Sequence, residues 1–235
     1  MSEPISESEP SEPIKVDIWS DIACPWCYIG KRKFEGGVSA FGEDPDSPQV
    51  IVEYHSFELS PDTPVDFDGS EIDFLAGHKG MQKEQVVHML DRVTGIARAT
   101  GLNYDFDILQ HTNTVKAHQL LHYAKAKGLQ LETVERLMRA YFTEGRHVGR
   151  IEDLADLAAE LGLDRDDVVR SLTDDEFLGE VRADQALARE YGVNGVPFFV
   201  IDGTYGVSGA QESGAFVQVL QRVQAERSAA EESIA

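Results

Sequence analysis

The two cysteines of this chain of 235 residues lie in one four-residue motif, Cys24-Pro25-Trp26-Cys27. A short apolar run over 15–19 precedes the motif and predicts a strand, and a helical pattern begins at Pro25, a residue suited to a first turn. Cys24 is therefore expected at a helix N-terminus, where unpaired amides and the helix dipole stabilise a thiolate. Because Cys27 follows one turn later, the spacing predicts a redox pair in which Cys24 attacks and Cys27 resolves.

Two other interpretations of the cysteine pair stay open. The spacing can arise by chance, in which case the cysteines are structural. The pair could also be half of a zinc site, which would need two further ligands such as histidine. The seven histidines lie between 55 and 147, away from the cysteines in the sequence. We therefore predict no metal site.

A second motif, Gly195-Val196-Pro197-Phe198-Phe199, opens a predicted strand. A proline at that place, preceded by a β-branched residue, fits a cis peptide in a turn beside a binding site. A trans proline that starts an edge strand is the alternative, because the cis form is the minority form.

The composition of the chain restricts the partners and the cellular compartment that we expect. The chain has 42 acidic and 21 basic residues, a formal net charge of -21. Nucleic acid and anionic membranes carry phosphate charge, so neither is expected as a partner. We find no apolar run of about 18 residues and no signal-peptide pattern at the start, so we expect a cytoplasmic protein. The acidic surface fits a well-solvated protein or an adaptation to high salt.

The elements around the two motifs predict an α/β fold. Strand, helix and strand over 15–57, with the helix over 25–41, are followed by an irregular connection over 58–80 and helical periodicity over 82–191. The periodicity is clearest over 131–142, where Leu131 shares one apolar face with five later residues. A hairpin over 198–207, whose first strand is 198–201, and a last helix over 211–225 complete the chain. This order indicates an α/β core (β-α-β and then β-β-α) split by a large all-helical insertion. The predicted parts are a disordered acidic tail (1–14), the core (15–60 and 192–226), the insertion (61–191) and a frayed tail (227–235).

Together the motifs resemble the thioredoxin superfamily. The residues that carry the resemblance are VDIWSDIACPWCYIG at 16–30 and GVPFFVIDGTYGVSGAQ at 195–211. The helical insertion is similar to that of the DsbA-like branch. Within it, NTVKAHQLLHYA at 113–124 and the segment 139–164 resemble the cytosolic FrnE-like group, which is related to 2-hydroxychromene-2-carboxylate isomerases and kappa-class glutathione transferases.

The resemblance implies roles for residues of both motifs. Cys24 would be the solvent-facing nucleophilic thiol, Cys27 the resolving thiol and Pro197 a cis-proline against the disulfide. Pro25 and Trp26 would shape the contact surface. The Val196 backbone would pair with an extended substrate peptide.

The middle of the chain adds two further candidate substrate-binding residues. Asn113, Thr114 and His118 match the group's Asn-Thr-x-x-Ala-His pattern. The resemblance implies that Asn113 and His118 form a wall of the substrate cleft. The alternative is that they cap and pack a helix.

Departures from the relatives shape the functional prediction. Because Pro25 and Trp26 replace the histidine-bearing pair of DsbA, and Asp21 adds a nearby negative charge, we expect a less oxidising pair. The isomerase and transferase relatives typically carry serine where this chain has Cys24, so the intact pair favours dithiol chemistry. The segment Gly209-Ala210-Gln211 differs from the glutathione-holding segment of the kappa class.

The sequence thus predicts a thiol-disulfide oxidoreductase for protein or small-thiol substrates. It needs no cofactor beyond the Cys24–Cys27 disulfide, and glutathione is kept open as a ligand. The first alternative is a glutathione-dependent isomerase or transferase acting on small aromatic compounds. The second is a non-enzymatic binding module with structural cysteines.

Overall fold

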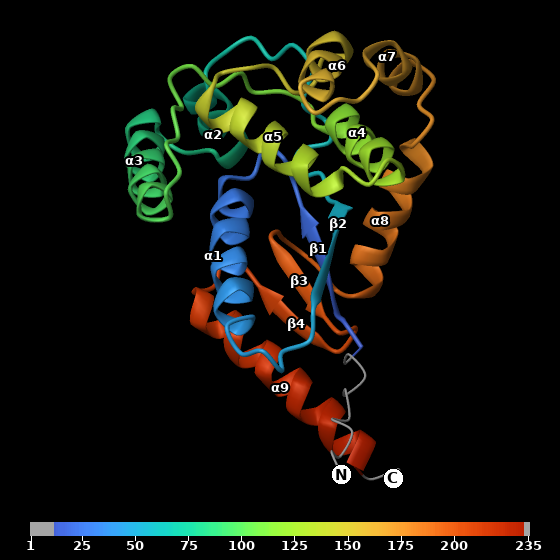
Figure 1. The fold of residues 1–235 in the computed structure, drawn as a ribbon. Helices are drawn as coiled ribbons and strands as arrows, with labels where there is room; N and C mark the ends of the chain where they lie inside the picture. Colours follow the sequence, from blue (N-terminus) through green and yellow to red (C-terminus); the bar gives the residue numbers. More distant parts are fainter. Residues whose placement is uncertain (1–11, 233–235) are drawn as a thin grey trace, which may run out of the picture.

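Four strands form one mixed sheet at the centre of the protein (Figure 1). The computed structural model describes residues 12–232. The sheet order is β2-β1-β3-β4, from β1 (Ile14–Ser20), β2 (Val50–Ser56), β3 (Phe198–Ile201) and β4 (Tyr205–Ser208). β1 and β2 run parallel, while β3 is antiparallel to both β1 and β4. The hairpin predicted near the end of the chain thus pairs with the first strand.

The alternation of side chains along β1 explains how both faces of the sheet are covered. Ile14, Val16 and Ile18 belong to the main core, which α1 (Pro25–Phe41) and α9 (Ser213–Glu232) share. Trp19 points to the other face, where it packs with residues of α8 (Leu178–Glu190) and its C-terminal loop. Because successive side chains of a strand point to opposite faces, one strand anchors both layers.

Small residues let α1 and α9 approach closely. A Cβ atom added at Gly37 would lie 2.8 Å from Cβ of Phe216 and 2.9 Å from the Ser213 carbonyl oxygen. The Ser213 hydroxyl donates to the carbonyl of Lys33 at 2.7 Å. Glycine at position 37 therefore allows the two helices to pack closely against each other on this face of the sheet.

The insertion covers the end of the sheet at which β1 and β2 finish (Figure 1). Its helices, with α8 completing the return to the sheet, are α2 (Glu71–Lys79), α3 (Lys83–Ala99), α4 (Val115–Ala126), α5 (Gln130–Thr143), α6 (Ile151–Ala159) and α7 (Arg165–Thr173). Buried side chains of the insertion and of the sheet form one continuous apolar cluster. The insertion is thus packed onto the end of the sheet from which the cysteine motif emerges.

The predicted fold class is confirmed, with differences at the edges. The first helix has the predicted bounds, and Asp164 caps α7 by accepting from the Asp167 amide. The connection over 58–80 was expected to be irregular, but it contains α2, whose start is stabilised by a capping box between Ser70 and Asp73.

The ends of the chain also differ from the prediction. Ile14 was assigned to the tail, but it is buried and begins β1. Residues 1–11 of the predicted disordered tail lie outside the described residues. α9 reaches Glu232, beyond the expected end of the last helix at 225, and Arg227 donates to Asp202 and to the backbone of Pro13. Within 12–232, no helix is long and apolar enough to cross a membrane.

Candidate active site

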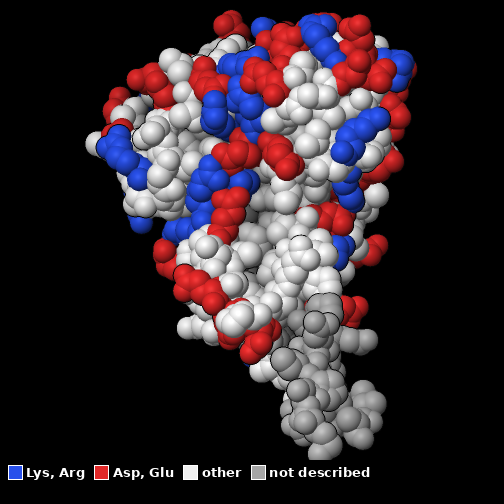
Figure 2. All heavy atoms as spheres, in the orientation of Figure 1, with Lys and Arg blue, Asp and Glu red and all other residues white. Residues whose placement is uncertain are grey.

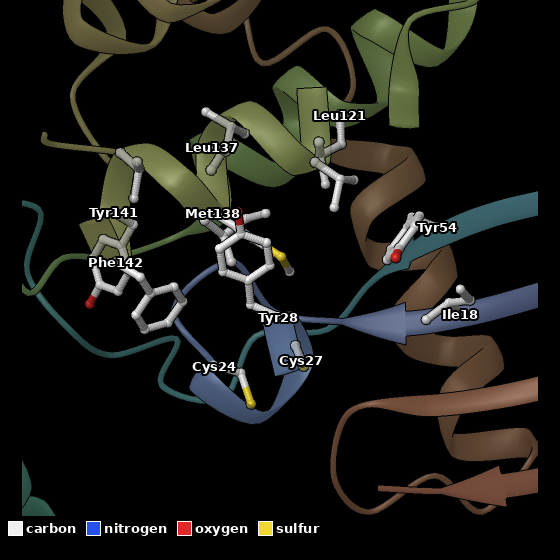
Figure 3. Close-up of a cluster of buried hydrophobic side chains, with 14 of the residues drawn as sticks. Ile18, Cys24, Cys27, Tyr28, Tyr54, Leu121, Leu137, Met138, Tyr141 and Phe142 are labelled. Carbon is white, nitrogen blue, oxygen red and sulfur yellow. The ribbon is translucent and has the colours of Figure 1, made fainter. Parts of the chain in front are cut away.

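The loop after β1 delivers the two cysteines to the first turn of α1 (Figure 3). Cys24 is the N-cap residue, with an extended backbone (φ -93°, ψ 112°), and Pro25 follows in the first turn. The Cys27 amide donates to the Cys24 carbonyl oxygen at 3.0 Å. The first turn carries no acidic side chain, so the partial positive charge of the helix end is left for the sulfur.

Both thiols are more enclosed than expected. Cys24 is only 3 % exposed and Cys27 2 %, whereas Trp26 between them is 40 % exposed. The prediction of a solvent-facing Cys24 is therefore wrong for this structure. The neighbouring loop covers it, since the Cys24 thiol lies 3.7 Å from the Val196 carbonyl oxygen, within hydrogen-bonding distance for sulfur.

The Val196–Pro197 peptide is cis, as the motif predicts. Pro197 is buried and packs against α1 so closely that a Cβ atom added at Gly30 would lie 2.8 Å from its Cγ. The structure thus brings the two sequence motifs together, although more than 160 residues separate them in the chain.

The two sulfurs are in different electrostatic situations. Burial raises the pKa of the Cys27 thiol well above its ordinary value, and a hydrogen bond with Cys24 adds to the effect. Because Cys27 is held as a buried thiol while Cys24 occupies the helix end, the arrangement suits Cys24 as the nucleophile and Cys27 as the thiol that resolves later.

The insertion holds the first turn of α1 from the other side. The Tyr104 hydroxyl donates to the Pro25 carbonyl at 2.7 Å, and the ring of Tyr104 stacks on Phe142 of α5 at 4.6 Å. Figure 3 shows Phe142, Met138 and Tyr28 converging above the cysteines. The insertion therefore fixes the geometry of the motif.

The basic residues that follow the motif are already paired. Lys31 and Arg32 both bond to Glu135 of α5, and the Tyr28 hydroxyl donates to the same carboxylate at 2.7 Å. Lys33 pairs with Glu212. The net charge of this cluster is therefore small, and its cations are engaged with carboxylates.

Beneath the motif, Asp21 is buried and fully hydrogen-bonded. Its carboxylate accepts from the Leu59 amide at 2.8 Å and lies 3.2 Å from Nε2 of His118. Burial alone would raise the pKa of Asp21, but the bonds from His118 and from the Leu59 amide outweigh it and lower the pKa. The carboxylate of Asp21, which was expected as a negative charge beside Cys24, thus contacts His118 of the insertion.

The two residues expected in the wall of the cleft lie deeper. His118 is fully buried under the motif, so its predicted contact with substrate is wrong for this structure, and it supports Asp21 instead. The Asn113 side chain accepts from the Val115 amide and donates to the Pro61 carbonyl, each at 2.9 Å. It joins the loop after β2 to the start of α4, and a role in substrate binding stays a prediction.

A cavity of about 440 Å³ opens beside the motif. Ala23, Pro25 and Trp26 form one side of it, and the facing side comes from α2 and α3. The apolar lining on those two helices is Phe74, Leu75, Met89, Leu90 and Val93. The sequence does not predict this site, because the expected irregular connection over 58–80 contains no helix, whereas α2 forms part of the lining. Its capping signal, Ser70 with Asp73 three residues later, could have revealed it.

One cluster has the ligand types of a metal site. Oxygen and nitrogen atoms of Asp17, Glu53 and His55 lie within 4.8 Å of one another. The Lys15 ammonium group is 2.9 Å from Asp17 and 3.2 Å from Glu53, and His55 Nε2 is 2.8 Å from Asp17. The geometry is that of an ion-pair network that joins β1 to β2.

A dithiol at the first turn of the helix after β1, facing a cis-proline before β3, defines the class: a thioredoxin-fold thiol-disulfide oxidoreductase. The chain belongs to the DSBA-like thioredoxin domain family, whose model matches residues 15–221.

Known proteins agree with this family. A probable DsbA oxidoreductase from Streptomyces coelicolor, SCO1869, superposes with a TM-score of 0.83 at 39 % identity, covering 91 % of each chain. The protein YwbO of Bacillus subtilis is 28 % identical over 195 residues, 81 % of this chain and 88 % of YwbO. The cytosolic disulfide reductase DsbM of Pseudomonas aeruginosa, solved with GSH, shares the fold (TM-score 0.60, 17 % identity, 91 % and 98 % covered).

Proposed function

We propose that this protein exchanges disulfides with protein or small-thiol substrates through Cys24 and Cys27. The observation that carries the proposal is the position of Cys24 at the N-terminus of α1, with its sulfur facing the Val196 carbonyl. The amides of the helix end point toward this sulfur, and the first turn of α1 carries no acidic side chain that would oppose a nucleophile there.

The reaction proceeds in two exchanges. The Cys24 thiolate attacks one sulfur of a substrate disulfide, that S–S bond breaks, and the other sulfur leaves as a thiolate. Cys27 then loses its proton and attacks Cys24, which releases the second substrate thiol and forms the Cys24–Cys27 disulfide. Since burial raises the pKa of Cys27, it stays protonated during the first step and does not compete with Cys24.

Substrate would approach over Trp26 and the loop at Val196. Trp26 offers an exposed ring beside the nucleophile, and Pro25 shares its side of the cavity. The backbone of Val196 next to Pro197 is the edge with which an extended substrate could pair. This reaction would need no bound cofactor, because the cysteine pair itself carries the two electrons.

Two variants test this mechanism. Cys24→Ser should abolish the reduction of insulin disulfides by the protein with a small dithiol as reductant, because serine is not a thiolate. Cys27→Ala should trap substrates as mixed disulfides, visible on gels as thiol-sensitive adducts. A Cys24→Ser variant that keeps its activity would contradict the mechanism. If Cys27→Ala captures no adduct from a cell extract, protein substrates are excluded and small thiols remain.

The intact cysteine pair favours this reaction over a glutathione-dependent isomerase or transferase. The cations nearest the motif along α1 are engaged with Glu135 and Glu212, so they offer no free site for the glutathione carboxylates. Calorimetry with reduced glutathione discriminates between the two. Thiols that do not cycle between dithiol and disulfide would instead favour a binding module. We further propose a cytoplasmic location, as for the cytosolic DsbM, which secretion assays with a tagged full-length chain would check.

A further inference from the structure

Two cationic side chains that line the cavity beside Trp26 form no ion pair within the described residues 12–232. In this acidic chain, ion pairs with Asp or Glu engage most Lys and Arg side chains, and Figure 2 shows the two signs side by side over much of the visible face. Within 12–232, the basic side chains that form no ion pair are Lys79, Arg92, Arg98, Lys127 and Arg189. Of these, Lys79 and Arg92 line the same cavity.

The carboxylates of the cavity are already bound, in contrast to its cations. Asp21 accepts from the Leu59 amide and lies beside His118, as described above. Oε2 of Glu71 lies 2.7 Å from Nδ1 of His111, and Glu71 is buried. The lysine and arginine side chains that remain for a ligand are therefore Lys79 on α2 and Arg92 on α3, both exposed.

An apolar surface forms another part of the cavity lining. Pro25 and Trp26 reach it from the motif, and Phe74 and Leu90 reach it from the insertion. A volume of about 440 Å³ lies within the range of sites for small molecules. The geometry thus pairs an apolar compartment with two cations, and the compartment is lined by the neighbours of Cys24 on both sides in the chain, Ala23 and Pro25.

We infer that this cavity binds the apolar, carboxylate-bearing half of a low-molecular-weight disulfide and so presents its sulfur to Cys24. The inference rests on the proposed function and names its substrate class. Cys24 attacks the sulfur of the bound half, the S–S bond breaks and the other half leaves as a thiolate. Cys27 then attacks Cys24 and releases the bound half as a second thiolate. The dithiol supplies both electrons, so the reduced protein needs no co-reactant for one turnover.

Three disulfide probes distinguish the contribution of the apolar lining from that of the two cations. Dithiobis-nitrobenzoate is aromatic and carries carboxylates, dithiodipyridine is aromatic and neutral, and glutathione disulfide is anionic but polar. The second-order rate constant of the reduced, full-length protein is measured with each by single-turnover stopped flow. Rates are compared between variants for one probe, because the probes differ in intrinsic reactivity.

Arg92→Gln and Lys79→Gln should each slow the reaction with dithiobis-nitrobenzoate about five- to tenfold, as expected for the loss of one cation near a bound anion. The neutral probe should change less than about twofold, since the cations do not act on it. Arg98→Gln is the matched control: it removes the same charge from the same helix but does not line the cavity. It should leave both rate constants unchanged.

A binding measurement tests the cavity without the thiol-disulfide exchange reaction. In the Cys24→Ser protein, the S-methyl derivative of the nitrobenzoate thiol should bind in calorimetry, and Arg92→Gln should weaken this binding by a similar factor. The inference is overturned if Arg92→Gln and Arg98→Gln have equal effects, if both aromatic probes slow alike, or if glutathione disulfide shows the same dependence on Arg92 as the aromatic acid. If the reduced wild-type protein reacts with no probe, the proposed function itself has failed.

Discussion

Nε2 of His118 lies 3.2 Å from Oδ1 of Asp21, and both residues are buried. Asp21 belongs to the loop between β1 and the cysteine motif, and His118 lies in α4 of the insertion. The contact therefore joins the two parts of the fold directly under the cysteines. Two residues that lie 97 positions apart in the sequence thus form one buried pair.

Asp21→Asn should destabilise the protein by about 1–3 kcal/mol at pH 7, because the buried contacts with the Leu59 amide and with His118 lose the charge of the carboxylate. The folded chain lowers the pKa of Asp21, so this stabilisation is present above the ordinary pKa of about 4 and is lost as the pH falls through the lower, folded value. Urea unfolding from pH 7 downward measures it, and the gap to the wild type should shrink in acid. Asp62→Asn, on an exposed loop, is the control. A gap that does not change with pH would contradict the assignment.

His55 should make the protein less stable in alkali. Burial lowers its pKa, but bonds to Asp17 and Asp184, each at 2.8 Å, raise the pKa to about 9. Because the folded pKa exceeds the unfolded one, the stabilisation is complete below about pH 6.5 and is lost as the pH rises through about 9. The free energy of unfolding should fall by about 2–3 kcal/mol across this range.

Trp19 offers a direct probe of this titration. Its ring stacks on His55 with centroids 4.5 Å apart, and Trp26 is the other tryptophan of the chain. In a Trp26→Phe background, Trp19 fluorescence should titrate near pH 9, and His55→Gln should abolish the transition. A fluorescence that stays flat between pH 7 and 10 would contradict a pKa of about 9 for His55.

Gly30→Ala should lower both stability and activity. Its Cβ would come within 2.8 Å of Cγ of Pro197, so the cis-proline loop must shift, at a cost of about 1–3 kcal/mol. Gly95→Ala on α3 is the matched control, because nothing lies within 4 Å of its Cβ position. That variant should gain about 0.5–1 kcal/mol from helix propensity alone. Chemical unfolding and insulin reduction check both. Equal gains in the two variants would show that Pro197 tolerates the methyl group.

The surplus of acidic residues should make the protein sensitive to salt. Half of the 42 carboxylates would remain unbalanced even if every one of the 21 basic residues were paired. Molar KCl screens the repulsion between them, so the melting temperature should rise relative to a low-salt buffer. Differential scanning calorimetry at both salt concentrations measures the shift. The same melting temperature in both would exclude an adaptation to high salt.

The local elements of the core followed from the sequence. The bounds of α1 and the strand Phe198–Ile201 agree with the prediction, because proline, β-branched residues and periodicity act over a few neighbouring residues. Leu131 shows the limit of such reasoning: it was expected inward on the apolar face of a helix over 131–142, yet it is 42 % exposed at the start of α5. Periodicity names a face of a helix but does not say how far the neighbouring element covers it.

The sequence by itself determined the chemistry, since the spacing of Cys24 and Cys27 at a helix start depends only on local structure. Tertiary packing decided what surrounds them. Packing buries Cys24 and places His118 against Asp21 instead of in the wall of the cleft. It also brings Lys79 and Arg92 into the lining of one cavity with Trp26. These relations join residues more than 50 positions apart. Their cause is the burial of one shared apolar core, a long-range effect that no local pattern encodes.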